Sequence, residues 1–359
     1  MKQQTPFHYP GCRNSHYMTV KLICFSLSRL SVVLCAVSNL PDNPPRVICL
    51  RIMNRRVKKG RNIQGILLLD KPIGMGSNEV LQVVKRLYHA RKAGHTGSLD
   101  QLASGLLPIC MGEATKLSGF LLNADKRYRA VFRLGEKTTT GDAEGEILES
   151  RPVPPMTRID LERVLAGFQG EIEQIPPMHS AIKHKGQRLY RLAQQGVVVE
   201  RAPRTITIHA LQLLGFEKNT MELDIHCSKG TYIRTLAEDV GEALGCGGHV
   251  LALRRTESGP FREADMVTLD RLRELAKQED FPLLDTLLLP MDAALSDWPQ
   301  VNLSEDVAYY FTKGQAVLIP HAPTHGQVRI YNTHRRFLGV GEILDDGRVA
   351  PRRLFAKSL

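Results

Sequence analysis

The chain has 359 residues, of which 43% are hydrophobic and 24% are charged. This length and composition exclude a chain without a packed core, and they allow one large domain with a small one. The formal net charge is +11, which favours a polyanionic partner such as nucleic acid.

Residues 1–52 differ from the rest of the chain because they contain no Glu and one Asp. The apolar run from Leu22 to Leu40 contains Arg29 and several serines, so it makes a marginal membrane span. A signal peptide would start late here, whereas the scarcity of acidic residues fits a transit peptide. We favour translation from Met53, with residues 1–52 as an over-long gene model or a disordered leader. Four of the seven cysteines fall in this part: Cys12, Cys24, Cys35 and Cys49.

From Met53 onward the pattern is orderly. Asn54–Arg61 is a basic arm, either a solvated tail or a contact for phosphates. Gly65–Pro72 predicts a buried strand that ends in a turn, where Lys71 either touches substrate or closes the turn. Ser77 is the predicted N-cap of a helix. One face of that helix carries Val80, Val83, Val84, Leu87 and Tyr88.

The helix leads into a predicted loop, Gly94–Pro108, which we identify as the candidate site of chemistry. Its glycines allow the backbone to approach a ligand closely. Asp100 stands between Leu99 and Leu102, and His95 precedes it by five residues. Partial desolvation tunes a carboxylate, so Asp100 is a candidate nucleophile or acid/base. An Asx-turn or N-cap aspartate is the structural alternative.

After the loop, residues 113–122 have helical spacing and residues 126–134 alternate as a strand. Tyr128 lies on the apolar face of this strand, where it either packs in the core or stacks on a base. Residues 138–145 resemble a turn and lack the Gly-Lys-Ser/Thr of a P-loop. The pattern of residues 158–168 predicts a helix.

Residues 175–191 combine Lys, Arg and His with Tyr190, a composition that suits an RNA-gripping surface or a solvated loop. Two strands follow, over 205–216 and 221–227. Arg234 comes two residues after Tyr232, and we expect its guanidinium to hold a buried carboxylate through bidentate hydrogen bonds.

The remaining pattern predicts a helix that ends within 241–248, a segment over 249–255 and a Leu/Arg-rich helix beyond Thr268. From Val301 we expect a short helix and two strands, which make a small β-rich module with a basic rim. Cys110, Cys227 and Cys246 show neither disulfide nor metal-ligand spacing, which predicts free thiols in a reducing compartment.

From about Arg61 to its C-terminus, the chain resembles the TruB family of pseudouridine synthases, which isomerise uridine 55 in the T-loop of tRNA. Each matching motif alone would be a weak signal, but their shared order is specific. The motifs are Gly65–Pro72, Gly94–Asp100, Lys126–Tyr128, Cys227–Arg234 and Leu253–Arg255.

The resemblance implies an α+β fold. Residues 53–297 would form a catalytic domain around a mixed, largely antiparallel sheet, and residues 298–359 a β-rich PUA-type RNA-binding domain. An insertion over about 175–204 would close on the T-loop.

The resemblance makes Asp100 the essential carboxylate, with Arg234 pairing to keep it ionised and Tyr128 stacking on the extracted base. The reaction detaches uracil from C1′, rotates it and rejoins it through C5. The carboxylate could attack C1′, take the C2′ proton or attack C6, and residue identity does not separate these routes.

The remaining implied roles concern substrate binding. Tyr232 and Leu253 would line the pocket, His95 would contact RNA as the uridine flips out, and Lys71 would support the site. The resemblance implies neither cofactor nor metal. We expect a cytoplasmic monomer that acts on the tRNA T-arm, with no membrane association and no obligate protein partner.

One departure from the family pattern is Gln101, which stands where members usually carry Pro and could loosen the loop slightly. Three alternative functions stay open on the residues alone. The chain could be a non-catalytic RNA-binding or RNA-folding protein, a guide-RNA-dependent synthase of the same superfamily, or an RNA N-glycosidase that releases uracil.

Overall fold

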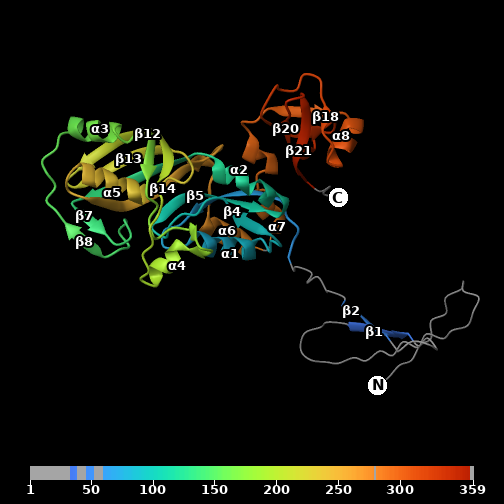
Figure 1. The fold of residues 1–359 in the computed structure, drawn as a ribbon, viewed down its shortest axis with the longest axis horizontal. Helices are drawn as coiled ribbons and strands as arrows, with labels where there is room; N and C mark the ends of the chain where they lie inside the picture. The colour runs from blue at the N-terminus through green and yellow to red at the C-terminus, as the bar shows by residue number, and fades with distance from the viewer. Residues whose placement is uncertain (1–32, 39–45, 52–59, 279, 356–359) are drawn as a thin grey trace, which may run out of the picture. The chain divides into compact units, whose positions relative to one another are not determined.

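The computed structural model describes residues 60–278 and 280–355, together with the backbone of two strands nearer the N-terminus, β1 Val33–Ser38 and β2 Arg46–Arg51. These two strands form an antiparallel pair (Figure 1). Contacts divide the chain into two compact units, Met1–Lys59 and Gly60–Leu359. Apart from the paired strands, the predicted leader lies outside the described residues.

A mixed sheet of ten strands organises the second unit. Its main order is β16-β3-β5-β14-β6-β13-β12-β9, with β4 beside β5 and β15 beside β14. All its pairs are antiparallel except β5–β14 and β3–β16, so the predicted mixed, largely antiparallel sheet is confirmed. The strands are β3 Gly65–Lys71, β4 Ala93–His95, β5 Ala103–Met111, β6 Lys126–Leu134, β9 Gly170–Gln174, β12 Arg204–Glu217, β13 Thr220–Cys227, β14 Gly248–Ser258, β15 Phe261–Arg262 and β16 Val267–Thr268.

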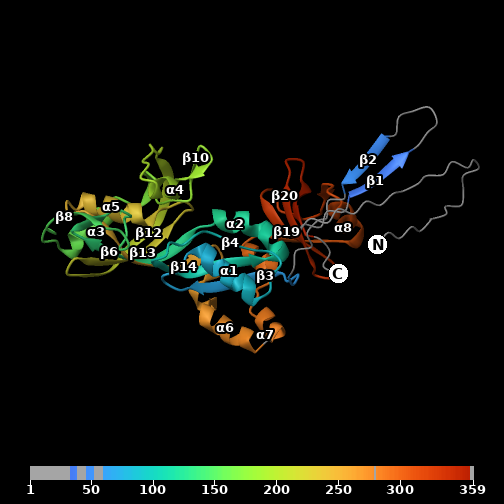
Figure 2. The same cartoon turned by 90° about the horizontal axis from the view of Figure 1, so that it is seen from below.

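Helices cover one face of this sheet in two groups, α1 with α6 and α7 over one half and α3 with α5 over the other (Figures 1 and 2). The helices are α1 Ser77–Leu87, α2 Ser118–Asn123, α3 Arg158–Ala166, α4 Leu189–Gln194, α5 Ile233–Ala243, α6 Leu269–Lys277 and α7 Phe281–Asp285. Short 3₁₀ turns span Gly112–Leu117, Glu263–Asp265 and Met291–Leu295. Two small ribbons are β7 Glu136–Thr138 with β8 Ile147–Ser150, and β10 Lys183–His184 with β11 Gln187–Arg188.

The predicted alternation of β6 is confirmed. Tyr128 and Phe132 are buried under the helices, whereas Arg127 and Arg129 point to the opposite face. On that outer face Arg127 pairs with Asp224 of β13, with 2.7 Å between Nη2 and Oδ2. Because successive side chains of a strand point to opposite faces, β6 has an apolar inner face and an outer face of paired charges.

A second cluster lies on the other side of β3 and β5, where Ile66 and Leu106 pack against α2 and the C-terminal module. Trp298 meets Phe120 edge-on with ring centroids 5.0 Å apart. Lys116 Nζ donates a hydrogen bond of 3.0 Å to the Leu354 carbonyl oxygen. The C-terminal strands thus share a core with the central sheet.

The C-terminal module is a five-stranded sheet in the order β17-β19-β20-β21-β18, and the predicted β-rich module is confirmed. The short helix predicted from Val301 onward is present but begins later, after Ser304, whose Oγ accepts from the backbone of Val307. Val301 instead alternates with exposed neighbours in a strand. The elements are β17 Gln300–Leu303, α8 Glu305–Thr312, β18 Val317–Leu318, β19 Gln327–Asn332, β20 Phe337–Ile343 and β21 Arg348–Leu354. Among the described helices, none is long and apolar enough to cross a membrane.

The predicted N-cap at Ser77 is wrong by one residue. Gly76 is the N-cap, and Ser77 is the first helical residue. Ser77 Oγ instead donates to the Leu99 carbonyl oxygen at 2.8 Å and accepts from the Leu99 amide at 2.7 Å. Ser77 therefore holds the segment that carries the candidate carboxylate. Its partner Leu99 lies 22 residues away, a contact that helical spacing cannot reveal.

The loop predicted over Gly94–Pro108 is also shorter than expected, because β4 and β5 leave only residues 96–102 outside strands. Gly105 belongs to β5, with φ +97°. A Cβ at Gly105 would lie 2.3 Å from the backbone oxygen of Arg255 on β14. Glycine here permits close strand approach, so a residue that resembles loop punctuation is part of the sheet.

We predict that Gly105→Ala lowers the free energy of unfolding by about 2–5 kcal/mol, since it combines a left-handed φ with overlap against backbone. Gly74→Ala is the matched control, because Gly74 has φ +82° but open space around its Cβ position, and it should cost only about 1–2 kcal/mol. Guanidinium unfolding of both variants measures the difference. Equal losses would contradict the steric argument.

Candidate active site

Asp100 and Arg234, which are far apart in the sequence, form an ion pair. Asp100 lies in the segment 96–102 between β4 and β5, and Arg234 is the second residue of α5. Arg234 Nε lies 3.0 Å from Asp100 Oδ2. The Arg234 side chain is 7% exposed and that of Asp100 is 45% exposed, so a buried cation holds a carboxylate that substrate can reach.

Other observations weigh against the Asx-turn alternative for Asp100. Among the described residues, no backbone N–H donates to its carboxylate, and the one local contact is from the Ala103 amide to the Asp100 main-chain oxygen at 3.2 Å. The side-chain oxygens are therefore not occupied by a turn, which leaves them free for Arg234 and for substrate.

The predicted bidentate pairing of Arg234 is wrong. Its Nη1 donates to the Thr140 carbonyl oxygen at 3.0 Å, and its Nη2 donates to that of His179 at 2.8 Å. These two carbonyls come from the turn after β7 and from the start of the insertion. They orient the guanidinium so that Nε is the nitrogen that lies next to the Asp100 carboxylate.

Asp142 is a second carboxylate at Arg234, and the sequence analysis missed it. Its Oδ2 lies 3.8 Å from Arg234 Nε, and its side chain is 5% exposed. Thr140 Oγ1 and the Glu144 amide both donate to Asp142 Oδ1. The composition of residues 138–145 indicated only a turn. The acidic residue within that turn, Asp142, was the signal that could have pointed to Arg234.

The electrostatic environment of Asp100 contains opposing contributions. Burial raises the pKa of its carboxyl group, and the nearby Asp142 carboxylate raises it further. Arg234, and to a lesser degree Lys71, lower this pKa because they favour the charged form. On balance the pKa of Asp100 lies above its usual value, with burial as the largest cause. The contact with Arg234 is the largest contribution that favours the charged form, and nearly half of the Asp100 side chain faces solvent.

Lys71 has no exposed surface. Its Nζ donates to the carbonyl oxygens of Pro72 at 2.8 Å and Met75 at 2.6 Å, and it lies 3.5 Å from that of Gln101. Burial lowers the pKa of Lys71 to about 8. Of the two interpretations of Lys71, the geometry favours turn closure beneath the loop. The Gln101 main-chain oxygen also accepts from the Gly74 amide at 2.9 Å. The turn after β3 therefore fixes the backbone at position 101, where family members usually carry Pro.

Tyr128, Leu253 and His95 surround the loop from neighbouring strands. Tyr128 on β6 and Leu253 on β14 are each 9% exposed, and burial raises the pKa of the Tyr128 phenol. His95 ends β4, and its buried Nδ1 has no hydrogen-bond partner among the described residues. Burial and the Arg255 charge lower the pKa of His95, so its ring is neutral at neutral pH.

Tyr232 is the N-cap of α5, just before the buried Arg234. Its amide donates to Gln174 Oε1 at 3.0 Å, and its carbonyl oxygen accepts from Gln174 Nε2 at 3.4 Å. Burial raises the pKa of the Tyr232 phenol. One glutamine of β9 thus fixes the turn that presents Tyr232 and Arg234 together.

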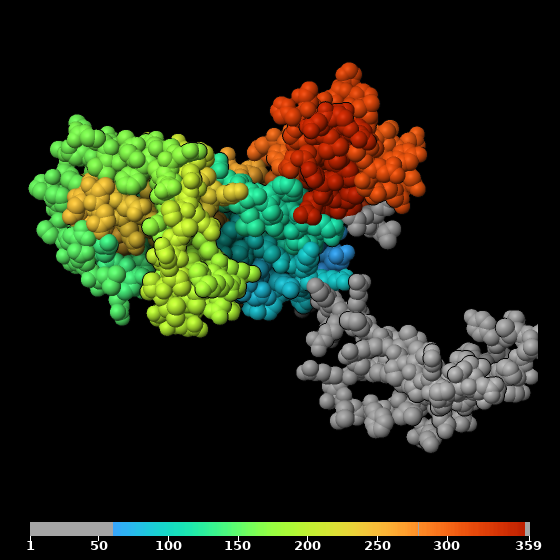
Figure 3. Space-filling view, viewed as in Figure 1, coloured from blue at the N-terminus to red at the C-terminus, as the bar shows by residue number. Residues whose placement is uncertain are grey.

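The basic segment 175–204 contains the β10–β11 ribbon and α4, which project away from the sheet in Figure 2. Figure 3 shows its yellow-green surface beside the teal surface of the segments around the loop, with a recess between them. A hollow within this segment is lined by basic side chains that include Lys183, Arg201 and Arg204.

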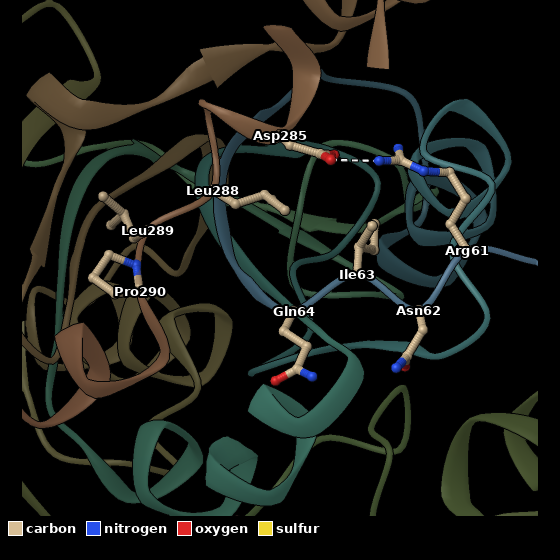
Figure 4. Close-up of a pocket in the computed structure, with 8 residues that line it drawn as sticks. All are labelled: Arg61, Asn62, Ile63, Gln64, Asp285, Leu288, Leu289 and Pro290. Carbon is tan, nitrogen blue, oxygen red and sulfur yellow. Dashed lines mark hydrogen bonds and ion pairs between the residues drawn. The ribbon is translucent and has the colours of Figure 1, made fainter. Parts of the chain in front are cut away.

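A larger hollow of about 510 Å³ lies elsewhere, between the residues that precede β3 and those that follow α7 (Figure 4). Arg61 pairs with Asp285 at its edge. None of the predicted site residues lines it. Within the described part of the chain, no group of three His, Cys, Asp or Glu side chains is arranged to hold a metal ion.

Three family models together match most of the chain from residue 85 onward. Residues 85–233 match the N-terminal domain of TruB family pseudouridylate synthases. Residues 234–296 match the C-terminal domain of tRNA pseudouridylate synthase B. Residues 299–355 match the C-terminal domain of pseudouridine synthase II TruB.

Among solved structures, the chain resembles one from a Cbf5–Nop10–Gar1 complex, with a TM-score of 0.64 and 27% identity over 81% of this chain and 85% of that one. A chain from an H/ACA ribonucleoprotein with bound substrate RNA, 24% identical and with a TM-score of 0.63 over 81% of this chain and 85% of that one, shares the fold.

Curated relatives are much more similar in sequence. The tRNA pseudouridine synthase B of Nitrosococcus oceani is 58% identical over 296 residues, which cover 82% of this chain and 96% of the relative. That of Serratia proteamaculans is 53% identical over 309 residues, covering 84% and 98%. The chain therefore belongs to the TruB family of pseudouridylate synthases, a family of isomerases.

Proposed function

We propose that this protein converts uridine to pseudouridine at position 55 in the T-loop of tRNA, with Asp100 as its nucleophile. Synthesis of pseudouridine in tRNA is the function named for its relatives at 53–58% identity. The observation that carries the residue assignment is the accessible Asp100 carboxylate held 3.0 Å from the buried Arg234 guanidinium.

The chemistry asks for a nucleophile that holds one fragment while the uracil detaches, rotates and rejoins through C5. An ionised carboxylate can attack C1′ of the ribose, remove the C2′ proton or attack C6 of the ring. Arg234 favours the ionised form that all three routes use. The fixed contacts of its Nη atoms preorganise the pair before substrate arrives.

The substrate uridine must leave its stack to reach Asp100. We infer that Tyr128 stacks on the extracted base, that Leu253 and Tyr232 line its pocket and that His95 contacts the RNA left behind. The basic segment 175–204 and its recess beside the loop (Figure 3) support a role in gripping the T-arm. Lys71 acts indirectly, through the turn after β3 that it closes.

Two alternatives differ from this proposal, one in the partners that it needs and the other in its product. A guide-RNA-dependent synthase would need its particle, and the Cbf5 complex is a structural neighbour, but its 27% identity stands against 58% for a relative named as a tRNA synthase. An RNA N-glycosidase would release free uracil. We further infer that the chain acts as a cytoplasmic monomer without an obligate protein partner, because the essential groups all come from one chain.

Asp100→Asn should reduce pseudouridine formation at the T-loop uridine at least about a thousandfold, since the amide is a poor nucleophile of nearly equal shape. Its tRNA affinity should stay near that of the unaltered chain. Mass-resolved nucleoside mapping and filter binding measure the two effects. Joint loss of activity and binding would make Asp100 structural, and free uracil would support the glycosidase.

Arg234→Ala should lower kcat by about 10²–10³-fold, because it removes the cation that orients Asp100. Arg129→Ala is the control: its side chain is 59% exposed on the outer face and lies 3.9 Å from Glu222, so its kcat should change less than about twofold. Circular dichroism checks that both variants fold. Similar small losses would remove Arg234 from the site.

Affinity for tRNA should fall at least about tenfold between 50 and 200 mM salt, because basic side chains displace counterions from phosphates. Asp100→Asn should show the same slope, since it changes no cation. An affinity that stays constant with salt would contradict a phosphate-binding surface.

A further inference from the structure

Arg255 of β14 has the largest of the fully buried side chains, with 1% exposure. Its neighbour on β14, Arg254, points to the outer face of the sheet. There Arg254 forms two hydrogen bonds of 3.0 Å with Asp70 and lies 3.2 Å from Glu263. The two successive arginines of β14 therefore differ in environment: Arg254 pairs with carboxylates on the outer face, and Arg255 is buried.

The Arg255 guanidinium contacts the chain on both sides of Asp100. Its Nε donates to the Leu106 carbonyl oxygen at 2.7 Å, and its Nη2 donates to that of Gly97 at 3.2 Å. Gly97 precedes Asp100 by three residues, and Leu106 follows it by six. One rigid guanidinium thus connects the start of the segment 96–102 with β5, the strand that follows it. A planar fork suits this task better than a flexible ammonium.

Arg255 is also a cation without an anionic partner. Among the described residues, no carboxylate lies within 4 Å of it. Its charge lowers the pKa of His95 and opposes the rise that burial causes in the pKa of Tyr128. Tyr128 is its direct cross-strand neighbour. A buried unpaired charge costs free energy, so a purely structural role would be filled more cheaply by an apolar side chain.

We propose that Arg255 is a positioning residue for the pseudouridine reaction, which clamps the start of the Asp100 segment to β5 and keeps the base pocket electropositive. The proposal rests on the proposed function. In each of the three routes, electrons move onto the uracil ring, either when its bond to C1′ breaks or when C6 is attacked. A fixed positive charge near Tyr128 stabilises that developing negative charge without reorganisation.

The test compares Arg255→Met and Arg255→Lys with the matched control Arg254→Met in the full chain. Single-turnover kinetics on a T-arm transcript should show a fall of about 100-fold for Arg255→Met, with the dissociation constant for RNA changed less than about threefold. Arg255→Lys keeps the charge but not the fork, so it should recover part of this loss. Arg254→Met should stay within about twofold of the unaltered chain.

A substrate-free readout separates the charge effect from a merely structural one. Nuclear magnetic resonance titration of labelled His95, assigned with His95→Gln, should show a higher pKa in Arg255→Met and an unchanged pKa in Arg254→Met. Because this readout needs no turnover, it tests the electrostatic role even if the unaltered chain makes no pseudouridine, a result that would instead overturn the proposed function.

Three results would overturn the role of Arg255: a folded Arg255→Met with full activity, equal effects at positions 254 and 255, or an unchanged His95 titration. If Arg255→Met does not fold, Arg255→Lys decides. A folded lysine variant with a rate reduced at least about tenfold supports the clamp, and full activity in that variant refutes it.

Discussion

The site depends on one guanidinium. Arg234 joins Asp100 to the carbonyl oxygens of Thr140 and His179, and so connects the loop before β5, the turn after β7 and the start of the insertion. Each contact alone contributes modestly, but together they leave this planar group one orientation. The carboxylate is consequently held by a side chain that two backbone carbonyl oxygens already orient.

The sheet makes this arrangement possible. β5 and β14 run parallel in an otherwise mostly antiparallel sheet, and they approach so closely that only glycine fits at position 105. The segment 96–102 therefore begins on β4, which pairs with β5, and ends on β5, which β3 and β14 hold on its two sides. A short segment between fixed ends gives a carboxylate more precise placement than the long loop we expected.

Two buried arginines serve the site in different electrostatic states. Arg234 faces Asp100 and Asp142, and its charge is shared between two anions. Arg255 faces backbone carbonyls instead. The first favours the ionised carboxylate, and the second leaves net positive charge beside Tyr128 and His95. Burial strengthens both effects because it reduces screening by water.

The local period of the sequence by itself determined the alternating strand β6 and the buried strand β3. The roles expected of Asp100, Tyr128 and Arg234 came from the resemblance of their motifs to a known family. Tertiary structure decided that Ser77 binds Leu99, that Arg234 is not bidentate and that Asp142 shares it. These contacts join residues 22–134 positions apart. Side-chain partners at such separations are set by packing of the sheet, which no periodicity within one segment records.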